Sequence, residues 1–209
     1  MTITAIAPQK HRKNHSSVFV DGAFAFGMSD EDIMMNHLAE GMDISQERLD
    51  YLTDHVIYTK AQEKAMRYLA TQPRSQYEVE KKLREDAYSD ETIERVVSLL
   101  LRYGYINDAQ FAVDYAQSRK RHGQYGPSRI RAELRRKGVG PDHISEALQQ
   151  EDGEYDEVSA IIAYLGRKRI VDITDSIKRK RIVDALHRRG FAYGPIQAAL
   201  KRFTHNCDE

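Results

Sequence analysis

The chain has 209 residues, of which 41% are hydrophobic, 31% charged and 9% aromatic, so it allows one or two ordinary cores with much exposed surface. Because 32 Lys and Arg balance 32 Asp and Glu, net charge alone says nothing about a nucleic-acid partner. No apolar run is long enough for a membrane span, no apolar signal segment follows Met1, and the single Cys207 cannot form an internal disulfide, so we expect a cytoplasmic protein.

The first predicted elements are short strands. Residues 3–8 and 18–26 carry the strand patterns of the chain, and in the second of them Asp21 and Gly22 separate two alternating apolar runs, which predicts a β-hairpin. The segment between them, residues 10–15, is polar and basic. Contact with a phosphate or a nucleic acid is one interpretation of that segment, and a solvated surface loop is the alternative that we favour.

Two serines predict helix starts after the strands. Ser29 is followed by three acidic residues, which favour the positive N-terminal end of a helix, and this helix is expected to continue through Leu38 and to end at Gly41. Ser45 predicts the start of a long helix that ends just before Pro73.

From about residue 59 the chain repeats itself with a period of 51 to 52 residues. The recurring positions are Val79, Leu83, Ala87, Tyr88, Ile93 and Val97 in the first unit, Ile130, Leu134, Gly138, Val139, Ile144 and Leu148 in the second, and Ile182, Leu186, Gly190, Phe191, Ile196 and Leu200 in the third. Ala61, Ala112 and Ala163 extend the spacing to the preceding helix. Each unit is therefore predicted to hold three helices, and a coincidence between unrelated amphipathic helices is the weaker alternative.

The predicted fold is mainly α: three tandem three-helix repeats in an elongated, curved array, with a small N-terminal β-hairpin plus helix. A unit of this size buries little surface alone, so neighbouring units are expected to stack. Acidic residues 151–154 predict a solvated linker before the third unit. The expected boundaries are 1–58 for the hairpin and helical extension, 59–106 for repeat 1, 107–150 for repeat 2 and 151–209 for repeat 3.

The most specific pattern lies in residues 107–139. Gly126 and Pro127 predict a sharp joint before a helix, because glycine permits backbone angles that other residues resist and proline presets the first helical turn. Apolar residues four positions apart then share one face of that helix, and Gly138 predicts a chain reversal at its end.

This stretch resembles the centre of the bacterial RecX family, whose members carry an acidic pair before Phe-Ala and then Tyr-Gly-Pro-x-Arg-Ile-x-x-Glu-Leu-x-x-Lys-Gly-Val. The matching positions are Asp108, Phe111, Ala112, Tyr125, Gly126, Pro127, Arg129, Ile130, Glu133, Leu134, Lys137, Gly138 and Val139. Asn107 stands at the first position of the acidic pair, where Asn caps a helix as well as Asp does. The N-terminal part also resembles longer members of the family, over fewer fixed positions.

The resemblance implies a regulatory protein without chemistry of its own. Members of that family bind RecA, the ATP-dependent recombinase that forms a helical filament on single-stranded DNA. They lodge in the filament groove, limit filament extension, and suppress ATP hydrolysis, strand exchange and co-protease activity. For this chain the implied partner is the RecA filament, with weak nonspecific DNA contact, and we expect a monomer that acts in recombination and DNA repair.

Positive charge gathers in the later units, and a basic stripe attracts phosphate backbones or an acidic protein face. The candidate residues for binding a partner or a nucleic acid are Arg119, Arg121, Arg129, Arg131, Arg135, Arg136, Arg179, Arg188 and Arg189. The alternative is that these side chains cover thin helical layers and keep them soluble.

No catalytic or metal-binding pattern is present, so we expect neither an enzyme nor a cofactor. A GxxxxGK[ST] loop is absent, and the eight histidines lack HExxH spacing or a Cys-x-x-Cys partner. The alternative function is a stand-alone helical DNA-binding protein, because three-helix units resemble helix-turn-helix folds. The third helices would read the DNA, but residues 141–149 carry Asp142 and Glu146 and no arginine.

Overall fold

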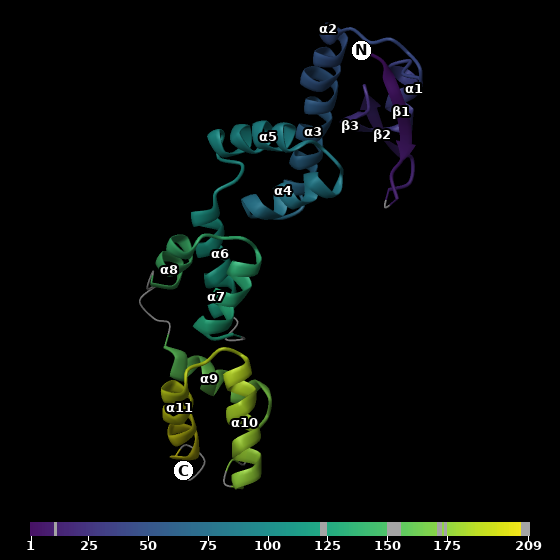
Figure 1. The fold of residues 1–209 in the computed structure, drawn as a ribbon. Helices are drawn as coiled ribbons and strands as arrows, with labels where there is room; N and C mark the ends of the chain where they lie inside the picture. Colours follow the sequence, from purple (N-terminus) through teal and green to yellow (C-terminus); the bar gives the residue numbers. More distant parts are fainter. Residues whose placement is uncertain (11, 122–124, 150–155, 171–172, 174, 206–209) are drawn as a thin grey trace. The chain divides into compact units, whose positions relative to one another are not determined.

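The computed structural model describes residues 1–10, 12–121, 125–149, 156–170, 173 and 175–205 (Figure 1). The chain divides into two compact units, Met1–Asn107 and Asp108–Glu209. The predicted class is confirmed: the described residues are mainly helical, with β-structure at the N-terminus.

Three strands form a small antiparallel sheet in the order β1-β2-β3: β1 (Ile3–Pro8), β2 (His15–Val20) and β3 (Ala23–Ser29). The predicted hairpin is the β2–β3 pair, and its turn residues Asp21 and Gly22 both have positive φ, 50° and 82°. The other segment with a strand pattern pairs with β2 and completes the sheet. One face of the sheet contributes Val18, Val20, Phe26 and Met28 to a core.

Helix α1 (Asp30–Met35) begins where the sequence predicts it, because the side chain of Ser29 accepts a hydrogen bond from the backbone N–H of Asp32. The prediction that this helix runs through Leu38 to Gly41 is wrong. The chain leaves the helix at Met35, and His37 takes a left-handed conformation with φ of 54°, which no helix tolerates.

The predicted long helix before Pro73 is confirmed, with one irregularity. It begins as α2 (Gln46–Tyr51), where the side chain of Ser45 accepts from the N–H of Arg48, and it ends as α3 (Tyr58–Leu69). Between them, residues Leu52–Ile57 form the π-helical segment η1. Leu52 and Ile57 lie in the core beneath the sheet, so the wider turn is packed on its apolar side.

The first three-helix repeat consists of α3, α4 (Gln76–Glu85) and α5 (Asp90–Arg102). Ser75 and Glu78 form a capping box at the start of α4, which satisfies two backbone donors. The core between the three helices contains Ala61, Ala65, Val79, Leu83, Ile93, Val96, Val97, Leu100 and Ile106.

The unit Asp108–Glu209 contains two further triples of helices, each around its own core. The first triple is α6 (Asp108–Arg121), α7 (Pro127–Arg136) and α8 (Pro141–Gln149), and the second is α9 (Glu157–Arg167), α10 (Ser176–Arg188) and α11 (Tyr193–His205). The predicted bounds of the helix at residues 141–149 are confirmed.

The same turn joins the second and third helix in all three repeats. Ala87, Gly138 and Gly190, which occupy the same recurring position in the three repeats, have φ of 58°, 77° and 86°. In each case the next residue donates its N–H to the carbonyl of the repeated leucine: Tyr88 to Leu83 (3.3 Å), Val139 to Leu134 (3.1 Å) and Phe191 to Leu186 (3.3 Å). The repeat register is thereby confirmed for the second and third helices.

The register of the first helices is wrong in the third repeat. Ala61 and Ala112 are fully buried, whereas Ala163 is exposed. The buried positions of α9 are Ile161 and Leu165, which follow Ala112 and Ala116 by 49 residues. The connection from Arg167 to Ser176 is longer than that from Arg121 to Pro127, so the spacing between the first and second helices is different in the third repeat.

Candidate partner-binding surface

Helix α7 carries several of the predicted basic residues, and buried apolar side chains hold it in place. Pro127 occupies its first turn, and Ile130 and Leu134 are fully buried four residues apart. Gly126 precedes it with φ of −82° and ψ of 168°, a conformation open to any residue. The interpretation that Gly126 supplies an unusual backbone angle is therefore wrong.

Gly126 is needed for space, because the turn after α10 packs against it. Its N–H donates to the carbonyl of Arg189 at 2.8 Å, and the N–H of Ser128 donates to the carbonyl of Gly190 at 3.3 Å. A Cβ on Gly126 would lie 2.3 Å from the carbonyl oxygen of Gly190, and a Cβ on Gly190 would lie 2.3 Å from the backbone nitrogen of Arg129. We call this backbone contact the glycine joint.

Glu133 is the centre of a polar cluster on one side of α7. Tyr115 Oη donates to Glu133 Oε2 at 2.8 Å, and Arg129 Nε donates to Glu133 Oε1 at 3.2 Å. Arg119 Nη2 donates to Tyr115 Oη at 3.2 Å, and Arg119 Nε lies 3.8 Å from Glu133 Oε2. Arg136 also approaches Oε1, at 3.8 Å, but its side chain is 75% exposed. The side chains of Arg119 and Arg129 thus already have partners within the protein.

The cluster keeps the Glu133 carboxyl charged. Burial alone would raise the pKa of Glu133, but the hydrogen bonds from Tyr115 and Arg129, with the charges of Arg129 and Arg119, outweigh burial and lower that pKa below its ordinary value. Burial, together with the nearby Glu133 charge, raises the pKa of Tyr115, so its hydroxyl keeps the proton that it donates.

Aromatic rings complete the cluster. The guanidinium carbon of Arg129 lies 4.1 Å from the centre of the Tyr125 ring, and that of Arg119 lies 5.7 Å from it. Lys137 Nζ lies 5.5 Å from the centre of the Phe111 ring, and both rings pack on the core of this triple. Tyr125 therefore has a structural role next to Gly126.

Replacing Glu133 with Gln is expected to lower the free energy of unfolding by about 1–3 kcal/mol near neutral pH, because charge-assisted hydrogen bonds are lost. Since the folded pKa of Glu133 is lowered, this contribution is present above the ordinary carboxyl pKa and is lost as the pH falls through the folded pKa. Urea unfolding of both proteins near neutral pH and in acid measures the difference, which should shrink in acid.

The control for that measurement is Glu146→Gln on α8, whose side chain is 69% exposed. It should change stability by less than about 0.5 kcal/mol. A Glu133→Gln difference that stayed constant from neutral to acid pH would show that the charge of the carboxylate does not stabilise the fold.

Arg131 and Arg135 lie on the solvent side of α7, one turn apart. Both side chains are exposed, and no residue in the described part of the chain forms an ion pair or a side-chain hydrogen bond with either. With the largely exposed Arg136, they leave three cations of this helix open to solvent. The cations at the end of α7 also lie at the negative end of the helix dipole.

The predicted basic residues around α10 likewise divide into those with a partner inside the protein and those that are exposed. Arg179 Nη2 donates to Gln197 Oε1 at 3.1 Å, and the guanidinium carbon of Arg189 lies 4.5 Å from the centre of the Tyr164 ring. Arg188 is exposed. Arg121 ends α6, but its side chain lies outside the described residues. Exposed cations outside the predicted set include Arg167, Lys168, Arg169, Lys178, Lys180 and Arg181, which the basic runs of the sequence mark.

Helix α8, the third helix of the triple that contains α7, presents negative charge to solvent. Asp142 and Glu146 are both exposed on α8, where they would repel a phosphate backbone.

In the described ranges, no group of three or more His, Cys, Asp or Glu side chains is placed to hold a metal ion. None of the helices that the structure describes combines the length and the apolar character that crossing a membrane requires.

Charge is distributed unequally between the two units. Residues 1–107 contain 13 Lys and Arg against 17 Asp and Glu, and residues 108–209 contain the remaining 19 against 15. The zero net charge of the whole chain therefore hides an acidic first unit and a basic second unit, and the exposed arginines of α7 belong to the basic one.

Three family models match this chain. Residues 1–45 match the regulatory protein RecX N-terminal domain, residues 61–100 match the first RecX three-helix domain, and residues 107–148 match the second RecX three-helix domain. The last match covers the stretch that resembles RecX by its sequence and that contains the Glu133 cluster.

Relatives and solved structures agree with these matches. The regulatory protein RecX of Bacillus cytotoxicus is 30% identical over 99% of this chain and 78% of its own length, and that of Clostridioides difficile is 29% identical over 99% and 97%. That of Lactobacillus johnsonii is 34% identical over 73% of this chain and 56% of its own length. A crystal structure of regulatory protein RecX has a TM-score of 0.63 at 24% identity and covers 96% of this chain and 98% of its own, which supports the fold. RecX from Lactobacillus salivarius has a TM-score of 0.61 at 25% identity and covers 70% and 96%. The chain belongs to the RecX family of regulatory proteins.

Proposed function

We propose that this protein binds the filament that the recombinase RecA forms on single-stranded DNA, and that it restrains ATP hydrolysis, strand exchange and co-protease activity there. It acts as a monomer in the cytoplasm. The proposal is supported by the family, whose curated members are named regulatory proteins, and by a basic helix with open cations. The observation on which it depends most is the exposure of Arg131 and Arg135 without a partner in the described chain.

Helix α7 suits this role because it presents charge from a fixed position. Ile130 and Leu134 anchor its inner face, and Gly126 joins its beginning to the turn after α10. Arg131 and Arg135 then require no rearrangement of the backbone to meet carboxylates or phosphates. An exposed ion pair contributes only about 0.2–1 kcal/mol, so binding requires several such contacts at once. Occupying a surface between filament subunits needs no catalytic group.

The direct test is RecA ATP hydrolysis on single-stranded DNA with this protein at a fraction of the RecA concentration. We expect inhibition at substoichiometric amounts, and shorter filaments in electron micrographs of the same mixtures. Unchanged hydrolysis and unchanged filament length at equimolar protein would refute the proposal.

Stand-alone DNA binding is the second candidate, and the exposed arginines of α7 are the observation in its favour. Against it, α8 presents Asp142 and Glu146 where a reading helix would meet base edges. Titrating duplex and single-stranded oligonucleotides at two salt concentrations separates the two functions. Tight, sequence-dependent DNA binding without RecA would favour the second, and weak binding that vanishes at higher salt would favour the first.

A further inference from the structure

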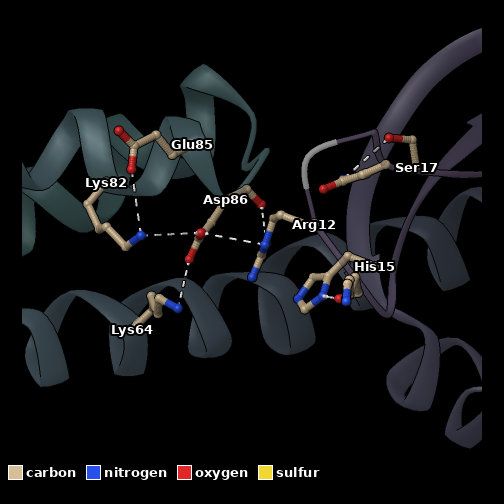
Figure 2. A network of polar contacts seen from close by, with 9 residues as sticks. Arg12, His15, Ser17, Lys64, Lys82, Glu85 and Asp86 are labelled. Carbon is tan, nitrogen blue, oxygen red and sulfur yellow. Dashed lines mark hydrogen bonds and ion pairs between the residues drawn. The ribbon is translucent and has the colours of Figure 1, made fainter.

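The unit Met1–Asn107 contains a cavity of about 230 Å³ at the junction of the sheet with the first repeat. Its walls come from the connection before β2 and the first residue of β2, from β3 and α1, from the segment from η1 to α3, and from the turn after α4. Figure 2 shows part of this junction, where Arg12 and His15 come from the sheet side and Asp86 from the turn. None of these residues belongs to the surface proposed for RecA.

The side chains around the cavity are predominantly basic. Lys60, Lys64 and Arg67 line it from positions i, i+4 and i+7 of one helix, so they share one face of the helical stretch that ends as α3. Arg12 and His15 line it from the sheet side. Against these five groups stand two carboxylates, Asp32 and Asp86.

Both carboxylates already have cationic partners. Asp86, whose side chain is 6% exposed, has Lys64 Nζ at 3.0 Å, Arg12 Nε at 3.6 Å and Lys82 Nζ at 3.8 Å (Figure 2). Arg12 Nη1 also donates to the Asp86 carbonyl at 2.9 Å. The positive charge of this network exceeds its negative charge before any ligand is considered.

The second carboxylate does not remove this excess of positive charge. Asp32 accepts from Ser29 Oγ at 2.6 Å and lies 3.1 Å from Lys60 Nζ. Arg67 has no carboxylate partner in the described residues; its Nε donates to the carbonyl of Glu63 at 3.4 Å. The Arg67 guanidinium therefore lines the cavity without a counter-charge of its own in the described residues.

Two further features fit a binding site. The π-helical segment η1 places Val56 and Ile57 in the wall, and π-helical turns are frequent at functional sites. Tyr88 also lines the cavity, and burial, with the nearby Asp86 charge, raises the pKa of its hydroxyl to about 12. The Tyr88 hydroxyl therefore stays protonated and can donate a hydrogen bond to an anion.

We propose that this cavity binds a phosphate group, with Arg67, Lys60 and Lys64 as its cationic contacts and the Tyr88 hydroxyl as a neutral donor. Phosphate matches several convergent cations, because it offers several acceptor oxygens and up to two negative charges. The cavity volume admits one such group and excludes a duplex. Without the ligand, Asp86 serves as the counter-charge for Arg12 and Lys64, and it competes with the anion for them.

The test uses the full chain and inorganic phosphate, titrated calorimetrically and in thermal unfolding against chloride at equal ionic strength. We expect saturable binding and a rise in the unfolding temperature with phosphate alone. Arg67→Gln should weaken phosphate binding about tenfold, as the loss of one charge-assisted contact requires. Lys81→Gln, an exposed cation of α4 that does not line the cavity, should leave it unchanged.

Equal effects of phosphate and chloride would mean ionic screening only and would overturn the proposal, as would equal losses in the two variants. Asp86→Asn gives an independent check, because removing the competitor should tighten phosphate binding in the folded protein. A single-stranded oligonucleotide identifies the source of the phosphate. If its binding also falls in Arg67→Gln, the site takes a nucleic-acid phosphate; if only inorganic phosphate is lost, the site takes a free one.

Discussion

The double charge reversal R131E/R135E is expected to raise the concentration of this protein that half-inhibits RecA ATP hydrolysis by about 30-fold or more. Replacing an attraction by a repulsion at two exposed positions costs about 1 kcal/mol or more at each. Helicity and the urea midpoint should stay as in the wild type, because both side chains are exposed and have no partner in the described chain. ATP hydrolysis titrations and circular dichroism of the same preparations measure the two quantities.

The matched control is K13E/K81E, which changes net charge by the same amount in the unit Met1–Asn107. Lys13 and Lys81 are exposed, and neither side chain has an ion pair in the described residues. If both double variants weaken inhibition equally, net charge and not the surface of α7 is responsible. If R131E/R135E loses helicity, these arginines hold the helix and the proposed surface lies elsewhere.

Turn chemistry and repeated spacing made most of the fold predictable. Gly138 and Gly190 mark a left-handed turn. The residue after each glycine donates its N–H to the carbonyl of the leucine that lies four residues before the glycine, and Ala87 occupies the same position in the first repeat. These signals are local, because the conformation of one residue decides them. Ser29 and Ser45 predicted helix starts for the same reason.

Two of the failures, at Ala163 and Gly126, have a common cause, since each depends on packing between distant segments. Ala163 fits the spacing of the sequence, but a longer connection after α9 shifts Ile161 and Leu165 into the core. Gly126 suggests an unusual backbone angle, but its φ is ordinary and its space is taken by Gly190.

The candidate surface was harder to predict than the fold. The sequence places Arg129 and Arg131 on one basic helix without distinguishing them, yet Arg129 is held by Glu133 and Arg131 is open to solvent. The four-residue spacing of Arg129 and Glu133 is a signal for that pair. Nothing local marks the part that Tyr115 and Arg119 play, because they reach Glu133 from another helix.

Gly190→Ala is expected to lower the free energy of unfolding of the unit Asp108–Glu209 by about 2–5 kcal/mol. A left-handed conformation costs a non-glycine residue about 1–2 kcal/mol, and φ at Gly190 is 86°. The added Cβ would also lie 2.3 Å from the backbone nitrogen of Arg129, and overpacking against backbone costs about 1–3 kcal/mol more. Urea unfolding measures the sum, and amide exchange at Gly126 reports directly on the glycine joint, because its N–H donates to Arg189.

Three other glycines separate the two causes. Gly104 has φ of 71° and nothing within 4 Å of an added Cβ, so Gly104→Ala should show the conformational cost alone, about 1–2 kcal/mol. Gly126→Ala should show the collision alone, because its φ is ordinary, and should speed amide exchange at the joint. Gly166 in α9 has neither problem, and Gly166→Ala should be neutral or stabilising by up to about 1 kcal/mol. If Gly190→Ala cost no more than Gly104→Ala, with amide exchange at Gly126 unchanged, the joint would contribute nothing to holding α7 against the turn that follows α10.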